Sequence, residues 1–148
     1  MKILVTGGAG FIGTNLIKRL LKEDHEVISI DNYSTGKTEN HIEGVRYYIK
    51  ETICNIVIDP PWQLIGFKPD VVFHMAAIAR IQPSFKHPEE YIDINFNGTY
   101  EIVKYCTKHN IPLIYAGSSS HHSGKFKNPY TFSKDLGEEI IKLYQKHF

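Results

Sequence analysis

A short apolar run followed by three regularly spaced glycines constrains the fold of this chain more than any other feature. Residues 3–5, Ile-Leu-Val, form a continuous apolar run, and glycines follow at Gly7, Gly10 and Gly13. The segment 11–22 then places its apolar residues at helical spacing. A strand that passes through a glycine turn directly into a helix is the first half of a β-α-β unit, so we expect a parallel sheet.

The rest of the chain alternates between β-branched runs and helical stretches in the same way. We expect strands at 3–5, 27–30, 45–49, 70–74 and 111–116, and helices at 11–22, 60–66, 88–108 and 130–147. The strands are continuous apolar runs, which is typical of strands covered on both faces. The sequence therefore predicts an α/β fold, a doubly wound parallel sheet (Rossmann fold) of five strands.

The composition fits one folded domain and argues against several classes of partner. Of the 148 residues, 42% are hydrophobic and 22% are charged, which is enough apolar surface for a core. Lys plus Arg (17) nearly balances Asp plus Glu (16), so we expect no nucleic-acid partner and no anionic membrane surface. No apolar run approaches the roughly 20 residues that a membrane span needs.

The first residues and the cysteines indicate a cellular compartment. The chain enters structured sequence at once, without a signal-peptide layout, and contains only Cys54 and Cys106. Two thiols make no disulfide framework and lack metal-ligand spacing, so we expect incidental thiols and a cytoplasmic protein. The adjacent His121 and His122 have no acid or thiol near them in the sequence, and we expect no metal site.

Each glycine of the turn has a separate physical use. Gly7 allows the tight turn, Gly10 lets the backbone approach a pyrophosphate, and Gly13 lets the helix pack closely on the strand. The start of the helix offers unpaired N–H groups and the positive end of its dipole to phosphates. This pattern favours a dinucleotide site, and the alternative is a set of glycines that serves only the turn.

Asp31 ends the predicted second strand, 18 residues beyond Gly13. A carboxylate at this place can accept hydrogen bonds from both ribose hydroxyls of adenosine. It would also repel a 2′-phosphate, and the glycine turn carries no Arg to attract one, so NAD is favoured over NADP. The alternative is a turn or capping aspartate, because Asn32 and Ser34 follow.

Tyr130 and Lys134 are four residues apart in the last predicted helix, and Pro129 suits its start. Tyrosine, with a reference pKa of about 10, is a poor base at neutral pH, but a nearby cation favours the phenolate. Such a tyrosine can take a hydroxyl proton while hydride leaves the same carbon. The serines at 118–120, just past the last strand, could hydrogen-bond the reacting oxygen. The alternatives are an ordinary helical pair and loop serines that cap or turn.

Together these motifs resemble one family. The matching segments are TGGAGFIG at 6–13, Asp31-Asn32, residues 73–77 and 95–99, the serine run and the YxxxK spacing. They resemble the extended short-chain dehydrogenase/reductases, in the NAD-dependent epimerase/dehydratase family. Residues 31–37, 83–84 and 88–91 are most similar to the N-terminal part of the UDP-glucose 4-epimerase type of nucleotide-sugar 4-epimerase.

The resemblance implies a role for each matching position. The cofactor would contact Gly7, Gly10, Phe11, Ile12 and Gly13 at its pyrophosphate, Asp31 and Asn32 at its ribose, Thr52 and Ile53 at its adenine, and Met75, Ala76 and Ala77 beyond the fourth strand. Thr52 replaces the aspartate that is usual there. Tyr130 would be the general base and acid, and Lys134 would bind the nicotinamide ribose and favour the Tyr130 phenolate. Ser119 aligns with the catalytic serine or threonine, with Ser118 and Ser120 as rivals, and Asn95 would support the active-site hydrogen bonds.

The resemblance also implies a reaction and its partners. In such epimerases NAD takes a hydride from C4 of a nucleotide sugar, the 4-keto intermediate rotates, and the hydride returns to the other face. The implied partners are a nucleotide sugar, here a UDP-hexose, and a second copy bound through helices 88–108 and 130–147. Apolar residues on the first of these helices (Tyr91, Ile92, Ile102 and Tyr105) could form that dimer or pack on the sheet instead.

Two departures from the family pattern leave alternatives open. The loop between Gly124 and Tyr130 is short, and the C-terminal domain that grips the sugar in relatives has no counterpart in this sequence. We therefore expect residues 1–148 to form one NAD-binding domain that carries the YxxxK motif, with no second domain and with weak or no activity by itself. The alternatives are a dinucleotide-binding module or fragment without turnover, and a nucleotide-sugar 4,6-dehydratase, although residues 118–123 lack the usual acids of that enzyme.

Overall fold

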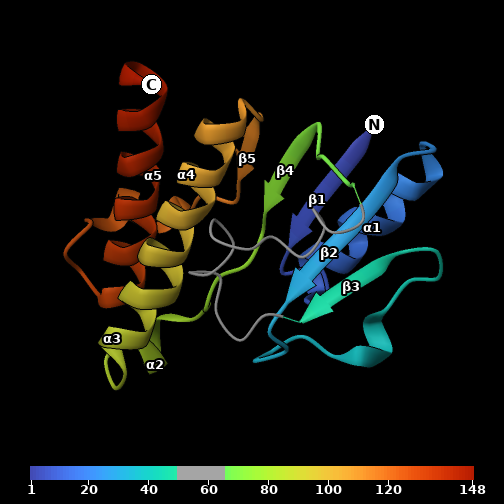
Figure 1. The fold of residues 1–148 in the computed structure, drawn as a ribbon. Coiled ribbons are helices and arrows are strands. Elements are labelled where there is room, and N and C mark those ends of the chain that lie inside the picture. Colours follow the sequence, from blue (N-terminus) through green and yellow to red (C-terminus); the bar gives the residue numbers. More distant parts are fainter. Residues whose placement is uncertain (50–65) are drawn as a thin grey trace.

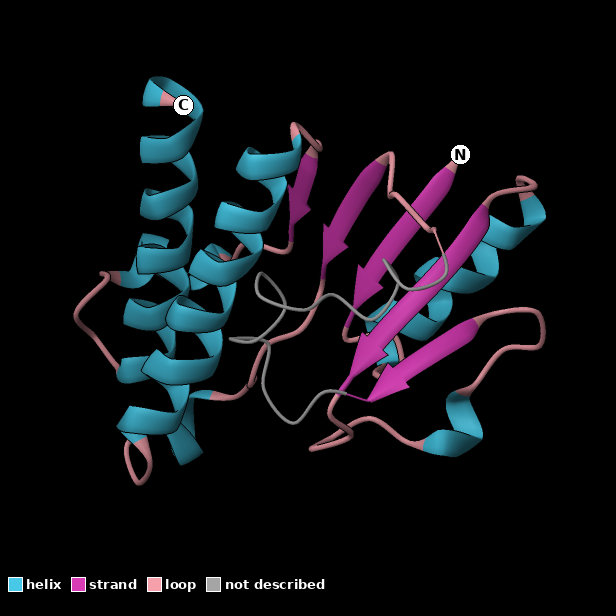
Figure 2. Ribbon diagram, viewed as in Figure 1, coloured by secondary structure: helices cyan, strands magenta, loops and turns pink. Residues whose placement is uncertain are grey.

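The computed structural model describes residues 1–49 and 66–148. Within them five parallel strands form a sheet in the order β3-β2-β1-β4-β5 (Figures 1 and 2). The strands are β1 (Lys2–Thr6), β2 (Glu26–Asp31), β3 (Arg46–Ile49), β4 (Val71–His74) and β5 (Leu113–Tyr115). The chain runs outward from β1 to β3 and then returns to the other side of β1. This is the predicted doubly wound fold, and the prediction is confirmed.

Helices cover both faces of the sheet. Ile3 and Val5 of β1 belong to the apolar cluster beneath α1 (Phe11–Lys22). Leu4, between them, belongs to the cluster beneath α4 (Gly98–His109). Successive side chains of a strand point to opposite faces, so β1 contributes to both layers. This explains the continuous apolar run that the sequence shows here.

The second half of the chain is more finely divided than the sequence predicts. It contains α2 (Ile81–Ser84), α3 (Pro88–Tyr91), the π-helical segment η4 (Ile92–Asn97), α4 and α5 (Pro129–His147). Figure 1 shows α4 and α5 side by side. The predicted helix 88–108 is continuous, but its middle is wound as a π-helix, which apolar spacing cannot reveal.

The shortest segments escaped the sequence prediction. α2 and the 3₁₀ turns η1 (Thr38–Asn40) and η5 (Ser119–Ser123) span too few residues to show a periodic pattern. The predicted helix at 60–66 lies outside the described residues except for Gly66, and so do Thr52, Ile53 and Cys54.

β5 is shorter than the predicted strand 111–116 for a local reason. Asn110 adopts the left-handed conformation (φ 53°) that ends α4, and the Ile111 N–H donates to the Cys106 carbonyl at 2.8 Å. Pro112 has no N–H to donate to a sheet. Strand pairing therefore begins at Leu113.

The apolar residues of helix 88–108 mostly pack within the chain. Tyr91, Ile102 and Tyr105 are at most 2% exposed, and Ile102 and Tyr105 lie in the core beneath α4. Of the two alternatives left open for these side chains, burial in their own chain holds for all three.

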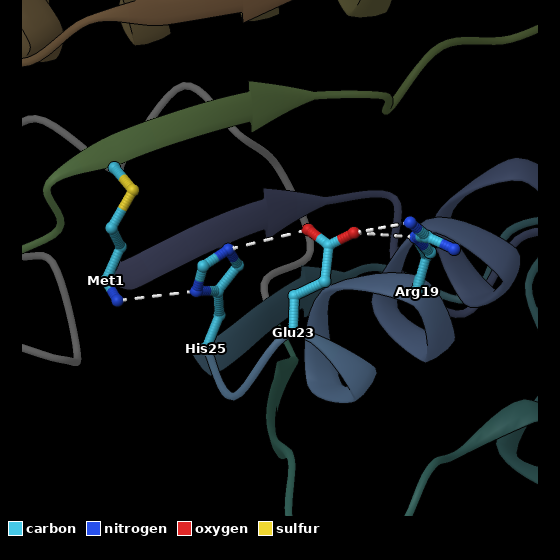
Figure 3. Close-up of polar contacts among 4 residues, drawn as sticks. All are labelled: Met1, Arg19, Glu23 and His25. Carbon is cyan, nitrogen blue, oxygen red and sulfur yellow. Dashed lines mark hydrogen bonds and ion pairs between the residues drawn. The ribbon is translucent and has the colours of Figure 1, made fainter.

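The amino-terminal edge of the sheet carries a chain of polar contacts near the surface (Figure 3). His25 lies between the amino group of Met1, 3.4 Å from its Nδ1, and the Glu23 carboxylate, 3.9 Å from its Nε2. Arg19 pairs with the same carboxylate at 2.7 Å, and both side chains are largely exposed. Exposed ion pairs of this kind contribute little stability.

Two further sequence expectations concern the cysteines and membrane-spanning segments. Cys106 is buried and free, and burial raises the pKa of its thiol to about 12. In the described part of the chain, no helix is both long enough and apolar enough to cross a membrane.

Candidate active site

The topology brings the predicted site residues to one edge of the sheet. The glycine turn follows β1, Asp31 ends β2, Met75 follows β4 and the serines follow β5. Because all strands are parallel, these positions share the carboxyl edge. The connections diverge between β1 and β4, since α1 and α4 cover opposite faces (Figure 1). Open α/β sheets bind ligands at such a switch point.

The glycine turn is packed so closely that Gly7 and Gly13, and Gly8 between them, admit no side chain without a shift of their neighbours. Gly7 has φ +72°, and a Cβ there would lie 2.8 Å from the backbone Cα of Ala76. A Cβ on Gly13 would overlap the Gly7 carbonyl oxygen. Gly10 is less crowded, with a Cβ position 3.3 Å from the same oxygen. Gly7 and Gly13 thus serve the turn and its packing, as predicted, and Gly10 stands at the open side.

The start of α1 is arranged to meet an anion. Gly10 is its N-cap, and no side chain caps the helix. The next two side chains point to solvent, with Phe11 85% and Ile12 63% exposed. The first N–H groups of a helix lack partners inside it and lie at the positive end of its dipole. Backbone donors without a side-chain cap, beside a crowded glycine turn, fit a pyrophosphate.

Asp31 is held in place by backbone donors and keeps room for more. Its Oδ2 accepts the Ala9 N–H at 2.9 Å, and its Oδ1 accepts the Tyr33 N–H at 2.8 Å. An ionised carboxylate has about four acceptor positions, so about two remain for other donors. The side chain is 8% exposed. Asp31 therefore fixes the glycine turn and can still accept the two hydroxyls of a ribose.

The loop after β2 closes against this carboxylate through residues that sequence reasoning gave no role. A Cβ on Gly36 would lie 3.1 Å from Asp31 Oδ1 and 2.9 Å from Ala9 Cβ. The Asn40 amide donates to the Ala9 carbonyl at 2.7 Å. Asn32 is exposed and accepts the Ser34 N–H at 3.0 Å, so its side-chain oxygen shapes the loop. Gly36, five residues after Asp31, was the sequence signal from which this closure could have been predicted.

The loop after β4 lies directly against the turn. Met75 donates its N–H to the Thr6 carbonyl, and Ala76 donates its N–H to Thr6 Oγ1, both at 3.2 Å. Met75, Ala76 and Ala77 are half-buried. The three residues therefore lie at the switch point, and their contact with the cofactor stays a prediction.

Tyr130 and Lys134 lie in the first two turns of α5. Asn128 caps this helix by accepting the Thr131 N–H at 2.8 Å, and Pro129 occupies its first turn. Tyr130 is half-buried, and its ring meets the ring of Tyr91 edge-on, with centroids 6.3 Å apart. The pair thus starts one residue inside a well-capped helix.

Lys134 is a buried cation. It is 4% exposed, and its Nζ lies 4.0 Å from the centroid of the Tyr115 ring. Burial lowers the pKa of Lys134 to about 8, and the charge of Glu138 opposes that shift. An amine with this pKa is still mostly charged at pH 7. The YxxxK interpretation requires a positive charge one turn from Tyr130, and a pKa of about 8 agrees with that requirement.

The serine turn is tied to the same helix through two of its three serines. Ser118 Oγ and Ser120 Oγ are 2.8 Å apart, and Thr131 donates to Ser120 Oγ at 3.1 Å. Ser119, which the family resemblance favours, is exposed. Ser120 is thus fixed against the residue that follows Tyr130, and the choice among the three serines stays open.

Glu138 holds the serine turn from the next turn of α5, a contact that the sequence analysis did not identify. Its Oε1 accepts the Ser118 N–H at 3.2 Å. A Cβ on Gly117 would lie 2.8 Å from that oxygen, so the carboxylate needs the glycine beside it. The sequence feature that could have predicted this contact is an acidic residue four positions after Lys134, on the same face of the helix.

Asn95 is 1% exposed and uses its side chain entirely within the protein. Its Oδ1 accepts the Ile78 N–H at 2.8 Å. Its Nδ2 donates to the Ile78 carbonyl at 3.0 Å and to Ser133 Oγ at 3.1 Å. Asn95 therefore joins the loop after β4 to α5, and its support of active-site hydrogen bonds stays a prediction.

The described residues place no group of three or more His, Cys, Asp or Glu side chains around a possible metal ion. The side chain of His122 is exposed in η5.

Comparison with known proteins agrees with this geometry. The family described as "NAD dependent epimerase/dehydratase family" matches residues 3–148. A putative UDP-glucose 4-epimerase of Methanocaldococcus jannaschii is 35% identical over 159 residues, covering 97% of this chain and 51% of the relative. The chain spans about half the length of the curated relatives it matches first.

Solved structures of the same kind superpose closely. UDP-glucose 4-epimerase of Thermotoga maritima, solved with UDP-glucose, has a TM-score of 0.91 and 26% identity, covering all of this chain and 52% of that one. UDP-glucose 4-epimerase of Bifidobacterium longum, in complex with NAD⁺ and UDP, has a TM-score of 0.88 and 27% identity, covering 99% and 49%.

Proposed function

Because the chain belongs to the NAD-dependent epimerase/dehydratase family, we propose that it is the cofactor-binding and tyrosine-bearing part of a nucleotide-sugar epimerase of the UDP-glucose 4-epimerase type. One observation carries the proposal. The buried Lys134 ammonium stands one turn from Tyr130 on α5, at the sheet edge that also holds the glycine turn and Asp31.

The cofactor contacts follow from the geometry of the carboxyl edge. The N–H groups of Phe11 and Ile12 would donate to the pyrophosphate. The N–H groups of Gly7 and Gly10 already donate to the Ile30 and Gly7 carbonyls, so these two glycines would hold the pyrophosphate by letting the backbone come close to it. Gly13 would keep α1 close to the turn. The free acceptor positions of Asp31 would take the ribose hydroxyls, with Asn32 shaping the loop beside them. Met75, Ala76 and Ala77 would line the cofactor, and Thr52 and Ile53 are proposed at the adenine on the resemblance alone.

The selection of NAD over NADP rests on charge. A 2′-phosphate in place of a ribose hydroxyl would meet the Asp31 carboxylate, whose two oxygens are already turned toward this site by the Ala9 and Tyr33 amides. Repulsion between two anions in a partly desolvated site costs several kcal/mol at most, enough for a clear preference.

Bound NAD would supply the hydride acceptor and donor for C4 of the sugar. Tyr130 would take the proton of the C4 hydroxyl as the hydride leaves, and would return it after the sugar has turned. The charge of Lys134 would stabilise the phenolate form of Tyr130 in this exchange. A serine hydroxyl of the turn at 118–120 would hydrogen-bond the same oxygen and fix its position.

The substrate and the assembly are parts of the same proposal. A UDP-hexose is supported by the similarity to epimerases solved with UDP-glucose or UDP. A homodimer through helices 88–108 and 130–147 would use side chains such as Leu143, which is 49% exposed on α5. A cytoplasmic location is part of the proposal, and the small number of cysteines supports it.

The test of the reaction is turnover of UDP-glucose with added NAD, followed by separation of UDP-galactose. We expect weak turnover by the 148-residue chain. Tyr130→Phe should lower it by about 100-fold or more, the usual contribution of a general base. Tyr144→Phe is the matched control, because Tyr144 lies on the same helix and its hydroxyl bonds only to Tyr100 at 3.2 Å among the described residues.

The result that contradicts the proposal is equally clear. If the chain binds NAD and yet converts no UDP-glucose beyond the level of Tyr130→Phe, the alternative of a dinucleotide-binding module without turnover is favoured for these residues.

A further inference from the structure

A single chain of buried hydrogen bonds joins the glycine turn to the tyrosine helix, and it passes through His74. His74 is the last residue of β4 and is 1% exposed. In the sequence it belongs to the matching segment 73–77, and no role was predicted for it. Its Nδ1 lies 2.6 Å from Thr6 Oγ1 at the end of β1. Its Nε2 lies 3.0 Å from Thr99 Oγ1 on α4. The ring therefore bridges β1 and α4 at the switch point.

The partners of the two hydroxyls decide which ring nitrogen carries the proton. Thr99 Oγ1 lies 2.6 Å from the Asn95 carbonyl, which can only accept, so Thr99 spends its proton there. The contact with Nε2 then needs a donor, and that donor is the Nε2–H of His74.

The other side of the ring agrees. Thr6 Oγ1 accepts the N–H of Ala76 at 3.2 Å and still holds its own proton. Nδ1 of a neutral Nε2–H imidazole has a free lone pair, which accepts that proton. The Thr6 hydroxyl thus donates to Nδ1 and accepts from Ala76, the Thr99 hydroxyl donates to the Asn95 carbonyl and accepts from Nε2, and the ring is used at both nitrogens.

The two ends of this chain are the two halves of the site. At one end, Ala76 lies against Gly7, where a Cβ would come within 2.8 Å of its Cα and of its N. At the other end, Asn95 donates to Ser133 Oγ, which donates in turn to the Tyr130 carbonyl at 2.9 Å. The five residues in the middle of this path (Thr6, His74, Thr99, Asn95 and Ser133) are each at most 1% exposed, so water cannot substitute for a partner lost there.

We propose that His74, as the neutral Nε2–H tautomer, is a positioning residue that couples the backbone of the cofactor turn to the placement of Tyr130. The functional value of this coupling rests on the proposed function. The tautomer and the hydrogen-bond network are independent of the proposed function. Burial, reinforced by the charge of Lys134, lowers the pKa of His74 to about 3, so the ring stays neutral throughout the physiological range.

The test uses a residue far from the cofactor turn in the chain. Thr99→Val removes the acceptor of Nε2–H on α4 and nearly preserves the side-chain shape. We expect two-bond ¹H–¹⁵N spectra of the wild-type chain to show the Nε2–H tautomer, and Thr99→Val to mix the tautomers. We expect the Ala76 amide to exchange with solvent about tenfold faster in Thr99→Val, as lost coupling of about 1.4 kcal/mol predicts.

Two further variants separate coupling from simple loss of stability. Thr99→Ser keeps the hydroxyl and should restore both the tautomer and the slow exchange of the Ala76 amide. Thr107→Val makes the same chemical change at an exposed position of α4 and should leave both unchanged. An Nδ1–H tautomer in the wild type, or Ala76 exchange that Thr99→Val does not alter, would overturn the proposal.

The cofactor supplies an independent readout. We expect the Kd for NAD to rise about fivefold in Thr99→Val, and an unchanged Kd overturns the coupling to cofactor binding. If the wild-type chain binds no NAD at all, the proposed function fails for these residues, while the tautomer and exchange results still decide the network.

Discussion

His25 and His74 show how differently the two edges of the sheet use the same side chain. At the amino edge, His25 lies in an open chain of charges between Met1 and Glu23, with distances of 3.4 and 3.9 Å (Figure 3). At the carboxyl edge, His74 is buried and bonds to two hydroxyls at 2.6 and 3.0 Å. Water can replace any contact of the first residue and none of the second. Specific geometry is therefore concentrated at the carboxyl edge, where the site lies.

The largest effect is expected at the glycine turn. Gly7→Ala combines a positive φ with a Cβ 2.8 Å from the Ala76 backbone and should lower the free energy of unfolding by about 3 kcal/mol. Gly44→Ala is the matched control, since Gly44 has φ +84° with open space around its Cβ, and should cost about 1 kcal/mol. Equal costs in urea unfolding would show that crowding at the turn is unimportant.

Replacing His25 and His74 by phenylalanine, one at a time, tests the contrast between the two edges directly. His74→Phe leaves the Thr6 hydroxyl without its buried acceptor and should lower the free energy of unfolding by about 2 kcal/mol. His25→Phe should change it by no more than about 0.5 kcal/mol. The measurement is urea unfolding at one pH. A loss at position 25 as large as that at position 74 would contradict the contrast between the two edges.

Lowering the pH should destabilise the folded chain through His74. Its pKa is about 3 in the folded chain and about 6.5 when unfolded, so between these values the unfolded state binds a proton that the folded state does not. Stability therefore falls as the pH falls from 6.5 towards 3, by up to about 1.4 kcal/mol per pH unit. The difference in this slope between wild type and His74→Gln isolates the effect from that of the carboxylates. Identical slopes would mean that His74 is protonated in the folded chain.

The smallest effect is expected at a buried hydroxyl that makes no hydrogen bond within the described residues. Ser29 Oγ has no hydrogen-bond partner among the described residues and lies where a Cβ of Gly8 would be. Ser29→Ala should leave the stability unchanged or raise it by up to about 1 kcal/mol. Thr6→Val removes an equally buried but paired hydroxyl and should cost more than about 1 kcal/mol. Thermal unfolding of the two variants checks the sign of the difference.

The sequence predicts this protein best where a periodic pattern is long. The bounds of α1 were predicted as residues 11–22, and all five strands were found, because apolar runs and a twelve-residue amphipathic stretch leave little choice. β5 lost residues at both ends, and at its start Pro112 and the left-handed Asn110 override the apolar run. The π-helical turn around Asn95 has no signature in apolar spacing.

The site was predicted as a set of positions but not as a network. Gly7, Gly13, Asp31 and the YxxxK pair are recognised from residue type and spacing. His74, Glu138 and Gly36 matter through partners that are distant in the sequence, such as Thr6 or Ser118, and only the fold reveals these. The serine that faces the reacting oxygen could not be chosen from the sequence, because three serines in a row differ only in how the turn orients them.

Calorimetric titration of the chain with NAD and NADP tests the central claim, that the carboxyl edge holds the cofactor. The informative pair is Asp31→Asn and Asp70→Asn, since each carboxylate accepts a backbone N–H, Asp31 at the carboxyl edge and Asp70 from Lys2 at the amino edge. We predict that NAD binds more tightly than NADP. Asp31→Asn should weaken NAD binding at least about tenfold and reduce the ratio between the Kd values for NADP and NAD. Asp70→Asn should change neither the Kd for NAD nor this ratio. Tight NAD binding that Asp31→Asn leaves intact would contradict the account.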